Sequence, residues 1–229
     1  MVKAVIFDLD NTLYDYTSNH KAGMSALTEK GAELLHVPAS EFAMTFEAGK
    51  AAVKGRHAGR ATSHSRLLFC QKTVELLGGN PFAVVPVLCK VYWAAFFENM
   101  VPYDGAMDFL KELKARKIRT AICTDMTAHI QYRKIEAMGF SQYLDCLVTS
   151  EEAMAEKPSA VLFQLALDKL DVASSEAVYV GDSRERDVQG ALWNGIRPIY
   201  FVGERAYEPE EGIEVARTYA EVRKLVLGD

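Results

Sequence analysis

The chain has 229 residues, of which 49% are hydrophobic and 25% are charged, and its formal net charge is −5. This length suits one full domain with a smaller insert, and this composition predicts a buried core rather than disorder. The negative net charge and the lack of a dense run of Lys and Arg argue against nucleic acid as a partner. The longest apolar stretches fall short of a membrane span, so we expect no membrane association.

The first residues of the sequence and the spacing of the cysteines indicate the cellular compartment of the protein. One Lys, a four-residue apolar run and then an acid do not form the pattern of a signal peptide. The four cysteines are scattered, without a CxxC pair, at Cys70, Cys89, Cys123 and Cys146. We therefore expect a cytoplasmic protein with reduced thiols.

Three short apolar runs, at residues 4–7, 120–123 and 177–180, each end in a cluster of polar residues. Continuous apolar runs of this length predict strands that are buried on both faces, as in a parallel sheet. Helical patterns separate the runs, and a further strand is expected over residues 196–202. The pattern predicts a doubly wound, Rossmann-like α/β core.

Residues 16–100 show helical periodicity and no convincing strand. One apolar stripe comprises Phe42, Phe46, Gly49 and Val53, and another comprises Leu67, Cys70, Val74 and Leu77. Pro86 should kink or interrupt the last helix of this region. We therefore predict a smaller all-α domain at residues 16–100, inserted into a core of residues 1–15 and 101–229.

Ligands of open α/β sheets bind beyond the carboxyl ends of the strands, where all three polar clusters fall. The sheet would bring Asp8, Asp10, Thr124 and Asp182 together. Carboxylates this close to one another need a cation, and oxygen ligands favour Mg²⁺ over zinc. Lys157, just before a predicted helix, supplies a further positive charge.

These segments resemble the four signatures of the haloacid dehalogenase-like (HAD) hydrolase superfamily, of the phosphatase type with an α-helical cap after the first signature. The signatures are Asp8-Leu9-Asp10-Asn11-Thr12-Leu13, Thr124, Glu156-Lys157-Pro158 and Gly181-Asp182-Ser183-Arg184-Glu185-Arg186-Asp187. All four occur in family order over nearly the whole chain. The resemblance implies a Mg²⁺-dependent phosphatase that acts on a small phosphate ester.

The resemblance also implies roles for the acids. Asp8 would attack phosphorus and form an aspartyl-phosphate. Mg²⁺ would be held by the side chains of Asp8 and Asp182 and by the main-chain carbonyl of Asp10. The Asp10 carboxyl would protonate the leaving oxygen and later accept a proton from water. Asp187 would contact a metal-bound water or Lys157, and Ser183 would also lie around the metal ligands.

The remaining implied roles concern the phosphoryl group. Thr124 and the main-chain N–H groups near Asn11 and Asp125 would bind its oxygens, and Lys157 would offset the charge of the transition state. Many relatives have Asn and then Gly after the Thr, whereas this chain has Asp125 and Met126. Since a carboxylate facing phosphate is repelled, the Asp125 side chain is expected to point away.

The insert contains a cationic stretch that runs from Lys54 to Arg66. One interpretation is a solvated loop and helix start; the other is that His64 and Arg66 lean over the active site and bind a second anionic group of the substrate. The sequence leaves both interpretations open.

The motifs also leave the activity partly open. A phosphosugar mutase shares them, and a non-catalytic phosphate-binding regulatory protein is a further alternative. Dehalogenation is disfavoured because Asp10, which such enzymes replace, is present. The identity of the substrate does not follow from the motifs, and both a monomer and a homodimer are compatible with the sequence.

Overall fold

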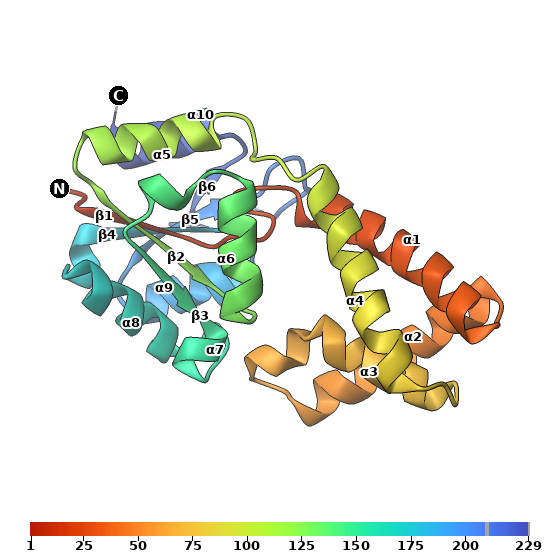
Figure 1. Cartoon of the computed structure of the whole chain (residues 1–229). Helices are drawn as coiled ribbons and strands as arrows, with labels where there is room; N and C mark the ends of the chain where they lie inside the picture. The colour runs from red at the N-terminus through yellow and green to blue at the C-terminus, as the bar shows by residue number, and fades with distance from the viewer. Residues whose placement is uncertain (209–210, 229) are drawn as a thin grey trace. The chain divides into compact units, whose positions relative to one another are not determined.

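A computed structural model describes residues 1–208 and 211–228. The chain divides into two compact units. The α/β unit consists of Met1–Asp15 and Val101–Asp229, and the helical unit consists of Tyr16–Met100. Figure 1 shows the strands in the first unit and four long helices, labelled α1 to α4, in the second.

The α/β unit is built on one six-stranded sheet in the order β3-β2-β1-β4-β5-β6, with every neighbouring pair parallel. The strands are β1 (Ala4–Phe7), β2 (Arg119–Thr124), β3 (Cys146–Thr149), β4 (Ala177–Gly181), β5 (Arg197–Phe201) and β6 (Glu214–Ala216). The strand order reverses at β1, which pairs with β2 on one side and with β4 on the other. In such sheets the reversal point is where ligands bind.

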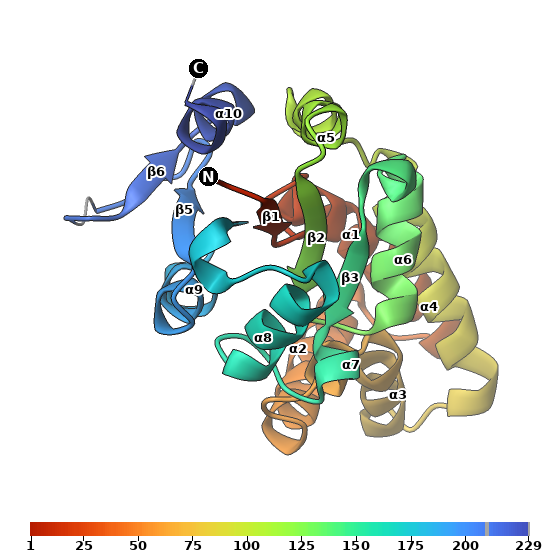
Figure 2. The ribbon, with the colours of Figure 1, turned by 90° about the vertical axis from the view of Figure 1, so that its left-hand side faces the viewer.

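Helices cover both faces of this sheet. They are α5 (Ala106–Ala115), α6 (Ala128–Ala137), α7 (Ser150–Ala153), α8 (Ala160–Leu170), α9 (Gln189–Trp193) and α10 (Tyr219–Leu227). Figure 2 shows α5 and α10 over one face, and α8 and α9 over the other. The predicted doubly wound α/β fold is therefore confirmed.

The central strand β1 shows why the strand sequences are apolar throughout. Ala4 and Ile6 belong to the core cluster that contains the buried side chains of α8, such as Phe163. Phe7 points to the opposite face, where its ring packs edge-on against Phe109 of α5 at 6.1 Å. All four residues of β1 are fully buried, as expected for a strand between two helical layers.

The four predicted strands are β1, β2, β4 and β5, and two strands were missed. β3 has only four residues, and β6 has three, at the edge of the sheet, one of them the charged Glu214. β6 is too short and too polar to give a signal, and β3 has only two large apolar residues, Leu147 and Val148, whereas β1 of the same length has Val5, Ile6 and Phe7. Both lie at the ends of the strand order, so the missed strands do not affect the centre of the sheet.

The helical unit contains α1 (Tyr16–Leu35), α2 (Ala39–Arg56), α3 (Arg66–Leu76) and α4 (Pro81–Glu98), with a 3₁₀ turn at Ala61–His64. The predicted stripe on α2 is buried as expected. On α3 the predicted Cys70 and Val74 are buried, whereas Leu67 is 53% exposed, and Arg66 and Phe69 belong to the buried face in addition. The sequence analysis assigned Arg66 to the cationic stretch and did not place it on this buried face.

Helix α4 continues through Pro86 without interruption, contrary to the expectation. Pro86 lies in the second turn, where the helix loses one N–H bond but has Asn80 as its N-cap. Among the described residues, α4 alone has the length and hydropathy of a membrane span, although apolar core helices share these properties. Its Tyr92, Trp93 and Phe96 are buried in the helical unit.

Two glycines of the helical unit test its packing. A Cβ atom at Gly31 would lie 2.2 Å from the ring of the buried Phe42, whereas at Gly55 it would meet nothing within 4 Å. We expect Gly31→Ala to lower the free energy of unfolding by about 1–3 kcal/mol. Gly55→Ala should be neutral or stabilise by up to ~1 kcal/mol, because alanine favours the helix. Thermal and denaturant unfolding measure the change in stability for each substitution. Equal effects of the two substitutions would contradict the close packing of Gly31 against Phe42.

Candidate active site

The carboxyl ends of β1 and β4 bring three acids together. Asp8 follows the last residue of β1, and Asp182 follows the last residue of β4, in strands whose ends are level in the sheet. Asp187 lies in the helical turn after β4 and is buried. One carboxylate oxygen from each of Asp8, Asp182 and Asp187 lies within 4.8 Å of the other two.

Lys157 neutralises part of this cluster. Its Nζ atom donates to Oδ1 of Asp8 at 2.6 Å, to Oδ1 of Asp187 at 2.6 Å and to the hydroxyl of Tyr179 at 3.3 Å. The three protons of the ammonium group therefore meet three oxygens. Burial alone would lower the pKa of Lys157, but Asp187 and Asp8 raise it well above its ordinary value, so that Lys157 stays protonated.

Asp8 is held at both oxygens. Oδ1 accepts from Lys157, and Oδ2 accepts from the hydroxyl of Thr12 at 3.2 Å. Burial raises the pKa of Asp8 to about 8; Lys157 opposes this shift, and the neighbouring carboxylates, Asp187 first among them, add to it. A carboxyl group in this environment gains from any further cation that binds beside it.

The carboxylate of Asp10 is held by a lysine and a tyrosine of its own. Lys134 of α6, a fully buried lysine, donates to both carboxylate oxygens of Asp10 at 2.7 and 2.8 Å. The hydroxyl of Tyr14 donates to Oδ1 at 2.6 Å. Asp10 is thus fixed beside the cluster, with about a quarter of its side chain exposed.

Thr124, the last residue of β2, is buried, and its hydroxyl is oriented by Gln131 of α6. The Gln131 amide donates to Oγ1 of Thr124 at 2.9 Å and to the carbonyl of Asp125 at 2.8 Å. The Asp125 carboxylate accepts from the main-chain N–H of Lys157 at 3.0 Å and lies 3.5 Å from Arg186. The side chain of Asp125 thus connects two loops of the site.

Met126 has a φ of 104°, which lies in the left-handed region that favours glycine. Ser150 holds this backbone: its hydroxyl accepts from the N–H of Met126 at 2.8 Å. The thioether of Met126 lies 3.7 Å from Nζ of Lys134. The strained residue therefore connects the loop after β2 with the lysine that holds Asp10.

The turn after β4 positions Asp187. The N–H of Ser183 donates to Oδ2 of Asp187 at 2.9 Å, and Oγ of Ser183 accepts from the N–H of Arg186. Of the two contacts expected for Asp187, the structure shows the one with Lys157. Gly181 permits this arrangement, because a Cβ atom there would lie 2.4 Å from that of Asp187.

Asp182 pairs with a cation from the next strand–loop segment. Arg205, after β5, lies 2.8 Å from Oδ2 of Asp182. Burial raises the pKa of Asp182, as does Asp187, whereas Arg205 lowers it. Asn11, in the turn after β1, adopts a φ of 62°, which asparagine tolerates better than most residues.

The sequence-based reasoning missed four residues of this site: Tyr14, Gln131, Lys134 and Tyr179. Gln131 and Lys134 did leave a signal. They lie three residues apart on α6, which begins just after Thr124, and both are fully buried beside Ile130 and Ile135. Two polar residues at helical spacing within an otherwise apolar face indicate side chains directed at a partner.

His64 and Arg66 lie in the helical unit. Much of the stretch before them is helical, because α2 extends through Arg56 and residues 61–64 form the 3₁₀ turn. Arg66 is 7% exposed and donates to the carbonyl of His64 at 3.0 Å and to the hydroxyl of Tyr16. Arg66 is therefore a fixed, buried cation of this unit.

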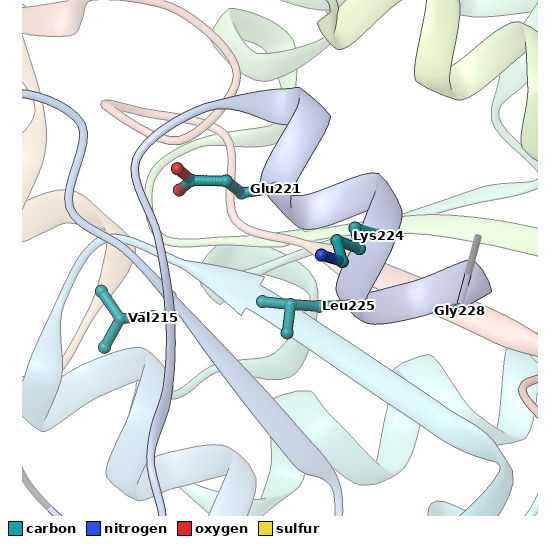
Figure 3. A pocket seen from close by; sticks show the side chains of 5 residues that line it. All are labelled: Val215, Glu221, Lys224, Leu225 and Gly228. Carbon is teal, nitrogen blue, oxygen red and sulfur yellow. The ribbon is translucent and has the colours of Figure 1, made fainter.

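A pocket between β6 and α10 is of a different kind (Figure 3). It is lined by Val215, Glu221, Lys224, Leu225 and Gly228. Arg197, the first residue of β5, donates to the carbonyl of Leu225 at 2.6 Å, which places this end of α10 at the amino ends of the strands. The pocket shares no lining residue with the cluster of Asp8, Asp182 and Asp187.

The acidic cluster fits a divalent cation. Asp8, Asp182 and Asp187 offer hard carboxylate oxygens, and the raised pKa values of Asp8 and Asp182 reflect negative charge concentrated in a buried place. A cation such as Mg²⁺ would offset this charge. The donor set contains no sulfur or imidazole, so it does not favour zinc.

Comparison with known proteins agrees with this site. A model of the haloacid dehalogenase-like hydrolases matches residues 2–195. A ribulose-1,5-bisphosphate 5-phosphatase of Halopiger xanaduensis is 38% identical over 95% of this chain and 92% of its own length. An N-acylneuraminate-9-phosphatase of Mus musculus is 27% identical over 91% of this chain and 85% of its own length.

A solved structure of an HAD phosphatase from Thermococcus onnurineus has the same fold, with a TM-score of 0.78 at 23% identity over 100% of this chain and 99% of that one. In this chain the acidic cluster and Lys157 lie at the carboxyl ends of the strands of the sheet. The chain belongs to the haloacid dehalogenase-like hydrolases, and within them it is an enzyme of the phosphatase type.

The raised pKa of Asp8 predicts a pH dependence of stability. Between about pH 4 and about pH 8 the folded protein keeps a proton on Asp8 that the unfolded chain has released. This contribution to stability is complete at the low end of that window and is lost as the pH rises to about 8. In chelator, the wild type should therefore lose stability relative to Asp8→Asn as the pH is raised. If the unfolding temperatures of the wild type and of Asp8→Asn changed in parallel with pH, the raised pKa of Asp8 would be contradicted.

Proposed function

We propose that the protein is a Mg²⁺-dependent phosphomonoesterase that acts on a small phosphorylated metabolite through an aspartyl-phosphate on Asp8. The observation that carries the proposal is the placement of Asp8, which lies 2.6 Å from the Lys157 ammonium group and within 4.8 Å of two further carboxylates. A nucleophilic carboxylate needs positive charge beside it to approach a phosphate dianion.

The cation would be held by the side chains of Asp8 and Asp182 and by the main-chain carbonyl of Asp10, with Asp187 behind them. When bound, Mg²⁺ supplies the charge that screens the phosphoryl group from the acids. Lys157, fixed by Asp187 and Tyr179, directs its ammonium group at Asp8 and offsets the charge that develops during transfer. Oδ1 of Asp8 is the oxygen nearest to Lys157.

The other protein groups divide the remaining work. Thr124, oriented by Gln131, and the backbone near Asn11 and Asp125 would bind the phosphoryl oxygens. Asp10 would protonate the leaving oxygen and then take a proton from the water that hydrolyses the aspartyl-phosphate. Lys134 and Tyr14 hold Asp10 in one orientation for both steps.

Two curated relatives have names that specify phosphorylated sugars: ribulose 1,5-bisphosphate and an N-acylneuraminate 9-phosphate. These names support a phosphorylated sugar or a similar small metabolite as the substrate class of this chain. Ribulose 1,5-bisphosphate therefore belongs in the first substrate panel. Product analysis would distinguish hydrolysis from transfer within the substrate, since only hydrolysis releases inorganic phosphate.

Replacement of the nucleophile tests the mechanism. We expect Asp8→Asn to lower kcat for p-nitrophenyl phosphate by at least about 10³-fold, because covalent attack needs the carboxylate. The wild type should lose activity in chelator and regain it with Mg²⁺, but regain little with Ca²⁺. Phosphate release is the measurement, and circular dichroism checks that the variant is folded. Near-normal turnover by the folded variant would refute the nucleophile.

The proton donor is tested by the leaving group. An aryl phosphate has a good leaving group that needs little protonation, whereas an alkyl phosphate needs it fully. We expect Asp10→Asn to lower kcat for an alkyl phosphate about 10-fold to 100-fold more than kcat for p-nitrophenyl phosphate. Lys134→Met, which keeps the length of the side chain, should show the same pattern more weakly. Equal losses on both substrates would contradict the acid role of Asp10.

A further inference from the structure

Asp125 adds a negative charge to the loop after β2, whose backbone is proposed above to bind the phosphoryl group. The side chain of Asp125 is only 10% exposed. Its Oδ1 atom accepts from the main-chain N–H of Lys157 at 3.0 Å. Its Oδ2 atom is buried and, among the residues that the structure describes, accepts no hydrogen bond. A buried carboxylate oxygen without a donor is unfavourable, so this charge requires a cation close by.

Arg186 supplies such a cation. Its Nη1 atom lies 3.5 Å from Oδ2 of Asp125, so the two side chains form an ion pair. Ser183 positions the turn that carries Arg186, because its Oγ atom accepts from the N–H of Arg186 at 3.3 Å. The side chain of Arg186 is 52% exposed, so that its loss leaves no cavity in the core.

Every other acid described above at this site is also paired with a cation. The ion pairs are Asp10 with Lys134, Asp182 with Arg205, and both Asp8 and Asp187 with Lys157. Within the described part of the chain, the ion pair of Asp125 is the one with Arg186. Removal of Arg186 would therefore leave one carboxylate of the site without its cation.

The positive charge of Arg186 also reaches the acidic cluster. Burial lowers the pKa of Arg186, but Asp125 raises it, and Asp187, Asp8 and Asp182 add to this rise, so that the net shift is upward. Because Coulomb interactions are mutual, Arg186 raises the electrostatic potential at each of these carboxylates. An anion that binds beside them gains from this potential.

Two roles are compatible with an ion pair in this position. In the first, the pair is a tether that holds the turn after β4 against the loop after β2. In the second, the arginine compensates the charge of the buried carboxylate. A tether is lost whichever member is removed, whereas compensation is needed only while Asp125 carries its charge. The two roles therefore predict different behaviour of the double variant.

We propose that Arg186 is a positioning residue of the second kind: it cancels the charge of Asp125, which would otherwise repel the phosphoryl group from the N–H groups of the loop after β2. Arg186 acts through Asp125 and does not touch the reacting atoms. The proposal rests on the phosphatase function proposed above and identifies a determinant of the affinity of that site for the phosphoryl group.

Arg186→Gln, Asp125→Asn and the double variant form the test. Asparagine keeps the shape of Asp125 and an oxygen that accepts from the N–H of Lys157, but it removes the charge. Titration calorimetry with inorganic phosphate and Mg²⁺ at low ionic strength measures affinity without turnover. We expect Arg186→Gln to weaken phosphate binding about tenfold and the double variant to bind within about threefold of the wild type. Asp125→Asn alone should bind at least as tightly as the wild type.

Two further variants separate the charge of Arg186 from its other properties. Arg186→Lys keeps the charge and should bind phosphate within about threefold of the wild type. Arg184→Gln is the matched control, because it removes an exposed arginine from the same turn. We expect Arg184→Gln to bind within about twofold of the wild type. Circular dichroism checks that each variant is folded.

Kinetics give a second readout. KM for p-nitrophenyl phosphate should rise about tenfold in Arg186→Gln while kcat falls less than about threefold, since the compensated charge affects bound substrate and transition state alike. An equal loss of affinity in Asp125→Asn and Arg186→Gln, or a double variant that binds no better than Arg186→Gln, would identify a tether and overturn the proposal. Wild-type affinity in Arg186→Gln would overturn it as well. Failure of the wild type to hydrolyse p-nitrophenyl phosphate would instead refute the phosphatase function, while the phosphate titrations would still decide the role of the ion pair.

Discussion

The site depends on one buried ammonium group between two buried carboxylates. Lys157 contacts Asp8 and Asp187 at 2.6 Å each, and all three side chains are almost inaccessible to solvent. Moving such charges out of water costs several kcal/mol per ion, and their attraction offsets this cost only when the remaining hydrogen bonds are made. Tyr179 supplies the last acceptor for Lys157 and itself lies in the core of the sheet. The packing of β4 around Tyr179 and the charge balance at Asp8 therefore depend on each other.

The two acids of the first signature, Asp8 and Asp10, also differ in the lysine that neutralises each of them. Asp8 is paired with Lys157, which lies just before α8, and Asp10 is paired with Lys134 of α6. Two carboxylates two residues apart thus meet different environments: Asp8 is buried among acids, whereas Asp10 is held by a lysine and a tyrosine and stays partly exposed. Different environments allow one carboxyl to act as a nucleophile and the other to exchange protons.

The sequence predicted those parts of this arrangement that local patterns encode. The runs that became β1, β2 and β4 are apolar throughout and end in polar residues, so the strand ends and Asp8, Thr124 and Asp182 followed from them. Lys134 did not follow, because a lysine on a helix usually faces solvent and its partner lies 124 positions away in the chain. The buried position of Arg66 was also missed, because one of the rings that enclose it, that of Tyr92, comes from another helix, α4.

The loop after β2 shows how such distant contacts affect the backbone. With glycine at position 126, a φ of 104° would be easy to adopt; with methionine it costs on the order of 1–3 kcal/mol. The side chain supplies what glycine lacks, a buried thioether 3.7 Å from Nζ of Lys134. Ser150 holds the strained N–H, and Gln131 holds the carbonyl of Asp125 just before it. The loop proposed to bind phosphate and the lysine that orients Asp10 are therefore joined through Met126, so a change at this position should disturb both.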